Sequence, residues 1–322
     1  MSGARPGGST DRERVLAREE LAGLPAEALA WAVAVAPGDV VDVVPVGGGI
    51  THTKWIVRLV GDTQLVLRWA DPVRWGPVGA EHVRREVLGC RLLVGSAIPV
   101  PAALACDPDG TVAGGPAYLL TWRPGRSRLD PLSPAAIDAL ARVAVTIHRQ
   151  AVPDGARPPD FAFRGSEDPQ VPGWTRRPQL WRRAIEVVRA GPPMTPYGLV
   201  HRDFHLGNTL WQRDEVSGVI DWAETSWGPP DVDVAHMCSN FAMMHGPSEA
   251  ALFARAYLRA GGRLDPDPDA SRFWAISDIL GFLPDPAHIL PAVQPTRPDL
   301  TAQGIREGLE GLLALVVRSG LG

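Results

Sequence analysis

The order of strand-like and helix-like segments constrains the fold of this 322-residue chain most strongly. Short runs rich in Val, Leu, Ile and Trp, which are typical of β-strands, fill the first third of the chain. They are Val40–Val46, Trp55–Val60, Gln64–Trp69, Ala102–Cys106 and Ala117–Thr121. A short helix is predicted over Pro25–Ala36, and the main helix over Ala80–Leu93, where apolar residues recur at helical spacing. We therefore expect an antiparallel sheet with one main helix.

The second half of the sequence is mostly helical in pattern. Ser133 followed by Pro134 is a typical helix start. Further helices are predicted over Gln179–Ala190, Glu249–Ala260, Ala270–Leu280 and Thr301–Val317. A Pro- and Gly-rich stretch over residues 152–178 is expected to be a surface loop anchored by Phe161, Phe163 and Trp174.

These patterns together predict an α+β fold with two lobes. We expect a tail over residues 1–20, an N-terminal sheet lobe over 21–122 and a larger, mostly helical C-terminal lobe over 123–322. A fold of this size can bury a core large enough for an enzyme.

Charge and cysteine content exclude several classes of protein. The chain has 32 basic and 36 acidic residues, and this net charge of -4 argues against nucleic-acid binding. No apolar run reaches the roughly 20 residues that a membrane helix needs. The amino terminus lacks the apolar core of a signal peptide, and the three cysteines are too far apart in sequence for a zinc motif. We expect a cytoplasmic protein without membrane or nucleic-acid partners.

A polar cluster lies between two apolar runs in the segment Tyr197–Trp211, which indicates a loop between two short strands. After a turn at residues 213–215, the returning strand brings Asp221 to the end of the hairpin where Asn208 lies. Asp203, Asn208 and Asp221 are therefore expected to converge. One carboxylate can accept a hydroxyl proton, and the other two side chains offer the oxygen ligands that magnesium prefers. This set predicts phosphoryl transfer.

The motif His201-Arg-Asp203-Phe-His-Leu-Gly-Asn208, followed by Ile220-Asp221-Trp222, resembles the aminoglycoside phosphotransferase and choline kinase branch of the protein-kinase-like fold. The resemblance extends from Val43 to about Trp227. It implies that the protein uses ATP and Mg²⁺. It also implies that Asp203 is the catalytic base that orients the acceptor hydroxyl, while Asn208 and Asp221 hold the magnesium ions.

The same resemblance assigns a nucleotide site to the N-terminal lobe. It implies that the backbone of three glycines approaches the phosphates, namely Gly47, Gly48 and Gly49. It further implies that the carbonyl of Thr121 and the amide of Arg123 bind adenine.

One position departs from the family pattern. Arg68 lies where kinase folds usually have a lysine that contacts the phosphates, and the resemblance pairs Arg68 with Glu86. Arginine offers phosphate a two-pronged guanidinium that is always charged. Two alternatives stay open: Arg68 can be a surface strand residue, or Lys54 can be the phosphate ligand.

Several other polar residues near the motif have two interpretations each. His201 is expected to be a buried scaffold residue. His205 can contact the transferred phosphoryl group or support the loop. Asp231 and Asp233 are expected to cap the following helix, in a region that braces the catalytic loop in the family. Glu224 can contact substrate or face solvent.

No long activation segment follows Asp221, which favours a small-molecule acceptor over a protein. The acceptor site is expected within residues 161–174, 224–227 and 273–289. Acidic residues there suit an amino sugar, and aromatic or apolar ones suit a macrolide-like molecule, unless they are ordinary solvated acids and core residues. They are Glu167, Asp168, Glu224, Asp278 and Asp285, and Trp174, Trp274, Phe282 and Leu283.

The predicted function is ATP- and Mg²⁺-dependent transfer of the γ-phosphoryl group to a hydroxyl of a small molecule, with antibiotic modification as one form. The alternatives are a metabolic kinase of the choline, homoserine or sugar type, and a catalytically silent nucleotide-binding relative. The sequence leaves the oligomeric state, the acceptor and the choice between ATP and GTP open.

Overall fold

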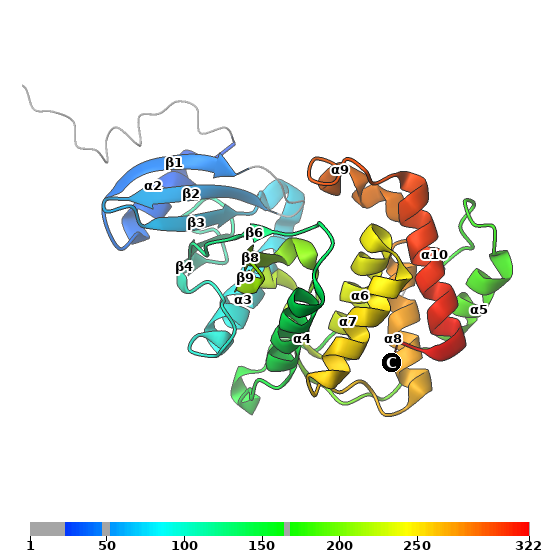
Figure 1. Ribbon diagram of the computed structural model, residues 1–322. Helices are drawn as coiled ribbons and strands as arrows, with labels where there is room; N and C mark the ends of the chain where they lie inside the picture. Colours follow the sequence, from blue (N-terminus) through cyan, green and yellow to red (C-terminus); the bar gives the residue numbers. More distant parts are fainter. Residues whose placement is uncertain (1–22, 47–51, 164–167, 322) are drawn as a thin grey trace, which may run out of the picture. The chain divides into compact units, whose positions relative to one another are not determined.

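The computed structural model describes residues 23–46, 52–163 and 168–321 (Figure 1). The predicted N-terminal tail and the glycines Gly47, Gly48 and Gly49 lie outside these residues. The chain divides into two compact units. The first contains the described residues up to Arg91 together with Pro101–Trp122, and the second contains Leu92–Val100 together with the residues from Arg123 onward.

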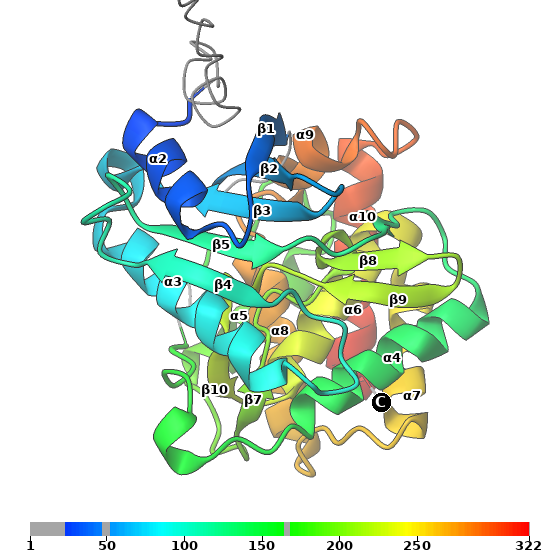
Figure 2. The ribbon, with the colours of Figure 1, turned by 90° about the vertical axis from the view of Figure 1, so that its left-hand side faces the viewer.

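The first unit is built on a five-stranded antiparallel sheet with the order β1-β2-β3-β5-β4 (Figure 2). Its strands are β1 (Val40–Val46), β2 (Thr53–Leu59), β3 (Gln64–Trp69), β4 (Ala103–Asp107) and β5 (Ala117–Thr121). The predicted antiparallel sheet is confirmed. The apolar runs bounded by turn residues located β1, β3 and β5 correctly, and β2 and β4 are shifted slightly from their predicted ends.

Alternation along β3 gives the sheet two different faces. Leu65, Leu67 and Trp69 join α2 (Ala26–Val35) in one apolar core cluster. The residues between them point to the opposite face, since successive side chains of a strand alternate. On that face Arg68 meets Glu86 of α3 (Pro72–Leu93). α3 begins earlier than predicted, because an extra helical turn precedes the predicted helix. The two are joined by a kink at Gly76, which adopts a positive φ of 47°.

The second unit is mostly helical, as predicted (Figure 1). Ser133 caps the first helix by accepting a hydrogen bond from the Ala136 amide at 3.2 Å, and Thr301 caps the last by accepting from Gly304 at 3.1 Å. The helices are α4 (Pro134–His148), α5 (Pro178–Arg189), α6 (Asp231–His245), α7 (Pro247–Arg259), α8 (Pro268–Gly281), α9 (Leu290–Val293) and α10 (Ala302–Ser319).

Helix α6 lies at the centre of this unit and contacts α7, α8 and α10. Between Asp231 and Met244 every residue except His236 is buried. Gly308 on α10 faces α6 so closely that an added Cβ atom would overlap the carbonyl oxygen of Ala242. The two helices are therefore packed backbone against backbone at this point.

The long loop before α5 is anchored by aromatic contacts, as predicted. The ring centroids of Phe161 and Trp274 are 5.6 Å apart, and those of Phe163 and Phe273 are 5.3 Å apart. Trp174 lies edge-on to Trp181 at 5.3 Å. Across the described residues, no helix has both the length and the apolar character needed to traverse a bilayer.

Candidate active site

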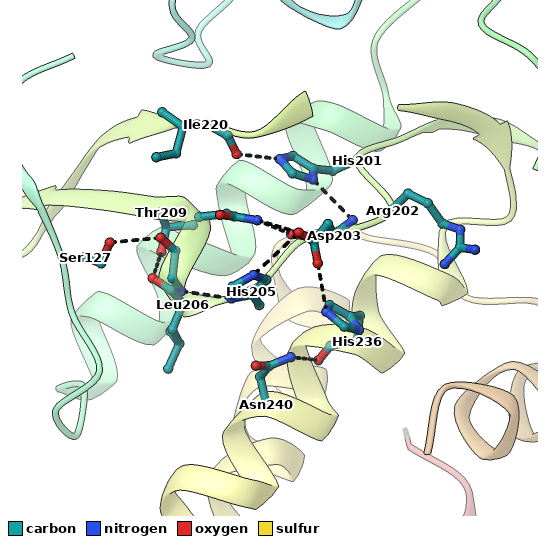
Figure 3. A network of polar contacts seen from close by, with 12 residues as sticks. Ser127, His201, Arg202, Asp203, His205, Leu206, Thr209, Ile220, His236 and Asn240 are labelled. Carbon is teal, nitrogen blue, oxygen red and sulfur yellow. Dashed lines mark hydrogen bonds and ion pairs between the residues drawn. The ribbon is translucent and has the colours of Figure 1, made fainter. Parts of the chain in front are cut away.

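The polar loop over residues 201–208 connects two short strands, as predicted (Figure 3). The first is β7 (Gly198–Val200), which pairs with β10 (Ser226–Gly228). The second is β8 (Thr209–Gln212), which pairs with β9 (Glu215–Val219) and with β6 (Arg126–Ser127). These short pairings fix both ends of the loop within the second unit.

The hairpin of β8 and β9 brings Asn208 next to Asp221. The Ile220 amide donates to the Asn208 carbonyl at 3.0 Å, so Asp221 follows directly on a residue bonded to Asn208. The backbone of Asp221 is left-handed, with a φ of 68°, a conformation that aspartate tolerates better than most residues. The predicted approach of these two residues is thus present in the backbone.

His201 is fully buried below this hairpin and ties it to the loop. Its Nε2 donates to the Ile220 carbonyl at 3.0 Å, and its Nδ1 accepts from the Asp203 amide at 3.3 Å. Burial lowers the pKa of His201 against the opposing effect of Asp233 and Asp203, which agrees with a neutral ring in these two contacts. The predicted scaffold role of this histidine agrees with its position.

Asp233 braces the loop from α6. Its Oδ2 accepts from the His201 amide at 2.8 Å and its Oδ1 from the Arg202 amide at 2.6 Å. His148 Nε2 lies 3.1 Å from the same carboxylate. Burial raises the pKa of Asp233, but His148, His201 and the hydrogen bonds outweigh burial and lower it overall.

The prediction that Asp231 and Asp233 cap this helix is wrong. Pro230 occupies the cap position, and both aspartates lie in the first turn of α6. Asp231 accepts from the amide of Asp265 at 3.1 Å instead. Both carboxylates instead accept from backbone amides far away in sequence. Of the two expectations for these aspartates, capping and bracing, the structure shows only the bracing of the loop, by Asp233.

Asp203 lies at the centre of the polar network (Figure 3). Asn208 Nδ2 donates to Asp203 Oδ2 at 2.8 Å, and His205 Nε2 lies 3.6 Å from the same oxygen. His236 Nε2 lies 3.3 Å from the other oxygen, Oδ1. Burial raises the pKa of Asp203, but His205 and His236 reverse this and hold it well below the ordinary value. The side chain is ionised at neutral pH and remains 39% exposed.

His236 was not among the predicted site residues. Its Nδ1 lies 2.9 Å from Asp278 Oδ1 on α8, and its ring stacks on Phe282 with 5.9 Å between centroids. Burial lowers the pKa of His236, whereas Asp278 and Asp203 raise it, to about 10 overall. One sequence signal points to this residue, because His236 follows Asp233 by three positions and therefore shares its face of the helix.

His205 makes the scaffold contact that was one of its two predicted alternatives, and its contact with the transferred phosphoryl group stays a prediction. Its Nδ1 accepts from the Gly207 amide at 3.0 Å and caps the short helical turn Leu206–Asn208, which is a scaffold contact. Its Nε2 faces Asp203. The side chain is thus fixed at one nitrogen and directed to the Asp203 carboxylate with the other.

Arg68 and Glu86 form the predicted pair in the first unit. Arg68 Nη1 lies 3.8 Å from Glu86 Oε2, and the two side chains are only 5% and 1% exposed. The guanidinium also lies over the Tyr118 ring at 5.5 Å. The alternative that Arg68 is a surface residue is therefore wrong. Lys54 pairs with Arg68 across β2 and β3, so both cations are on the same face of the sheet.

The predicted adenine-binding residues fall on different units. Thr121 ends β5 in the first unit, where its Oγ1 accepts from the Ala102 amide at 2.8 Å. Arg123 belongs to the second unit, and its Nη2 donates to the Ser217 carbonyl at 2.9 Å. Adenine binding by their backbone stays a prediction.

Most residues considered for the acceptor site have structural partners. Trp274 is buried and donates to Thr195 Oγ1 at 3.0 Å, and Trp174 donates to the Pro284 carbonyl at 2.9 Å. Asp168 pairs with Arg189 at 2.7 Å and Asp285 with Arg306 at 3.0 Å, while Asp278 pairs with His236. Glu224 is exposed at the end of the turn Trp222–Glu224, and Glu167 lies outside the described residues.

The donor set suits a hard cation bound together with phosphate oxygens. Asn208 Nδ2 donates to both the carbonyl and the carboxylate of Asp203, at 3.0 and 2.8 Å. Both amide hydrogens are thereby engaged, which leaves Oδ1 as the atom of this side chain that could ligate a cation. Within the described ranges, no group of three or more His, Cys, Asp or Glu residues forms a metal site from protein atoms alone. Magnesium is usually held by one or two protein oxygens plus the phosphates of a substrate.

A sheet unit and a helical unit with an Asp-Asn-Asp set define the class of kinase-like phosphotransferases. Residues 42–274 match the model of the phosphotransferase enzyme family, and the chain belongs to this family. A mouse protein, acyl-CoA dehydrogenase family member 10 of Mus musculus, is 29% identical over 224 residues, which cover 62% of this chain. The chain spans only 21% of the length of that protein and of a second curated relative it matches.

Solved structures confirm the α+β, kinase-like fold. A spectinomycin phosphotransferase in complex with ADP and spectinomycin aligns with a TM-score of 0.60 and 14% identity, over 91% of this chain and 97% of that one. An amicoumacin kinase in complex with AMP-PNP and Ca²⁺ aligns with a TM-score of 0.59 and 15% identity, over 91% and 93% of the two chains.

Proposed function

We propose that this protein is an ATP- and Mg²⁺-dependent O-phosphotransferase that acts on a hydroxyl group of a small molecule. The observation that carries the proposal is the state of Asp203. Its carboxylate is ionised, 39% exposed and bonded to Asn208, whose backbone is bonded to the residue before Asp221. A fixed, accessible carboxylate beside two oxygen ligands is what phosphoryl transfer to an alcohol requires.

In this proposal Asp203 binds and orients the acceptor hydroxyl. Transfer forms a bond between the hydroxyl oxygen and the γ-phosphorus and breaks the bond from that phosphorus to the β-phosphate oxygen. The hydroxyl proton passes to Asp203. Because its low pKa makes Asp203 a weak base, we expect it to act mainly by orientation and to receive the proton late in the step.

Asn208, through Oδ1, and the Asp221 carboxylate are the groups that would hold magnesium. When bound, the cation neutralises negative charge on the phosphates. In the first unit, the buried guanidinium of Arg68, fixed by Glu86, is the cation assigned to the phosphates. The glycines Gly47, Gly48 and Gly49, together with the backbone of Thr121 and Arg123, complete the nucleotide site on the family pattern.

The class of acceptor has two candidates. The antibiotic ligands in the names of the structural neighbours favour an antibiotic-type acceptor. The curated relatives are named as acyl-CoA dehydrogenases, which favours a metabolic acceptor. Hydroxylated acyl-CoA thioesters are therefore candidate acceptors alongside choline, homoserine and sugars. The alternative to both acceptor classes is a catalytically silent protein, which would bind nucleotide without turnover.

The test is ADP release from ATP against a panel of aminoglycosides, macrolides, choline, homoserine, sugars and hydroxyacyl-CoA thioesters, with the phosphorylated position read by ³¹P NMR. We expect Mg²⁺-dependent release with at least one acceptor. Asp221→Ala is expected to lose the Mg²⁺ dependence of ATP binding measured by calorimetry. Equal ATP affinity of the unaltered protein with and without Mg²⁺ would reject the metal assignment, and ATP binding without transfer to any acceptor would favour the silent alternative.

A further inference from the structure

We propose that His236 and Asp278 form a charged bridge that positions the Asp203 carboxylate for the acceptor hydroxyl. The bridge runs from Asp278 Oδ1 through His236 Nδ1 at 2.9 Å, and from His236 Nε2 to Asp203 Oδ1 at 3.3 Å. Three separate elements contribute to it, namely the polar loop, α6 and α8. All three belong to the second unit.

The bridge contacts the Asp203 oxygen that the neighbouring loop residues leave uncontacted. Asn208 and His205 both approach Asp203 Oδ2, and His236 approaches Oδ1. Rotation of the carboxylate would break contacts on both oxygens at once. Oδ1 has two lone pairs, so it can accept from His236 and still accept from an acceptor hydroxyl. His236 therefore fixes one carboxylate oxygen that can still accept from the acceptor hydroxyl.

The surroundings of His236 favour its protonated form. Asp278 faces it from α8, and Asp203 faces it from the loop. His205 also comes from the loop, with its ring centroid 5.7 Å away. Phe282 stacks on the ring of His236, and His288 also stacks on Phe282, with 6.2 Å between their centroids. Two carboxylates outweigh one imidazole, which agrees with the raised pKa of about 10 for His236.

A protonated His236 has no free nitrogen to take a proton at neutral pH. It is therefore a positioning residue and not a second base, because both of its nitrogens donate to carboxylates. Asp278, which the sequence suggested as a possible ligand for an amino sugar, serves in this arrangement to hold the imidazolium. The catalytic part of this inference rests on the proposed function, whereas the charge state of the bridge does not.

The first experiment measures the bridge directly, with no need for activity. Protein with ¹⁵N-labelled histidine is titrated by NMR, and the His236 signals are assigned by their loss in His236→Gln. We expect both ring nitrogens to be protonated at pH 8, and we expect Asp278→Asn to move the midpoint to lower pH. A neutral His236 ring at pH 8, or a midpoint that Asp278→Asn leaves unchanged, would overturn the bridge.

The second experiment measures positioning by turnover of Mg²⁺-ATP with water as the acceptor. His236→Phe keeps a ring that can stack on Phe282 but removes both donors, and we expect turnover to fall at least tenfold while ATP affinity stays the same. His236→Gln keeps one N–H donor and should restore part of the rate. The control is the same change on the same helix, His245→Phe, which should leave turnover unchanged.

The outcomes separate the two proposals. Full turnover in His236→Phe would overturn the positioning role. A loss of turnover accompanied by parallel losses of ATP affinity and thermal stability would also overturn it, because such a pattern indicates a purely structural effect. If the unaltered protein binds ATP but never hydrolyses or transfers it, the proposed function fails. The NMR titration then still decides whether the charged bridge exists.

Discussion

Arg68 on β3 and Glu86 on α3 form an ion pair from which solvent is almost excluded, with Nη1 and Oε2 3.8 Å apart. The pair ties the main helix of the first unit to its sheet. Removal of one partner of a buried ion pair leaves an uncompensated charge in a medium that solvates it poorly. This pair therefore has a structural effect that is separate from any contact with phosphate.

We expect Arg68→Ala to lower the free energy of unfolding by about 3–5 kcal/mol, the usual effect of breaking a buried pair, and also to weaken ATP binding. Arg68→Lys keeps a positive charge and should retain more of both. Urea unfolding and calorimetric titration with Mg²⁺-ATP measure the two effects. Lys54→Ala, on the same face of the sheet, is the comparison. If only the Lys54 variant loses ATP affinity, the phosphate ligand is Lys54.

Asp203→Asn should reduce turnover by about 10² to 10⁴, the typical contribution of a positioned general base. ATP affinity should change little, because Asn208 and Asp221 remain. Steady-state kinetics with the acceptor found in the panel provides the measurement. Asp214→Asn, in the exposed turn between β8 and β9, is the matched control and should behave like the unaltered protein. Normal turnover in Asp203→Asn would remove this residue from its assigned role.

Asp233→Asn tests the brace under the loop. An amide offers a single acceptor oxygen, so either the His201 or the Arg202 amide loses its partner. An unsatisfied buried amide costs about 1–3 kcal/mol, and we expect that loss of stability together with slower turnover. Asp231→Asn, two residues earlier on α6, should leave turnover unchanged because Asp231 bonds Asp265 and not the loop. Equal turnover in the two variants would contradict the brace.

The stability of the protein should depend on pH through His236. Its pKa is raised from 6.5 to about 10 in the folded protein, so folding favours the protonated ring. This stabilisation is complete below about pH 6.5 and is lost as the pH rises toward 10. Urea unfolding between pH 6 and pH 10, compared with His236→Gln, isolates it. The difference between the two proteins should shrink as the pH rises, and a constant difference would be inconsistent with the raised pKa.

Local patterns predicted the sheet of the first unit well. Runs such as Gln64–Trp69 are apolar, short and bounded by turn residues, which leaves few alternatives to a strand. The approach of Asn208 and Asp221 was also predictable, because a tight hairpin returns the chain to its starting point. In both cases the information lies within a few neighbouring residues.

Features that depend on distant contacts were not predictable in this way. A helix was expected after Asp231 and Asp233, but its extent was not, because α6 is buried almost all round and lacks the polar face of an amphipathic helix. The aspartates at its start look like caps in sequence, yet their partners are amides of other segments. The contact of His236 with Asp278 joins residues 42 positions apart, which no spacing rule relates.

Gly308 on α10 packs against α6, the helix that also contacts the polar loop. This helix carries Asp233 and His236, which contact the polar loop and the Asp203 carboxylate, so a shift of α6 would shift these contacts. A single methyl group at Gly308 would push α6 away from α10. The position of the carboxylate to which we assign the acceptor hydroxyl therefore depends in part on Gly308, at a point where the chain admits no side chain.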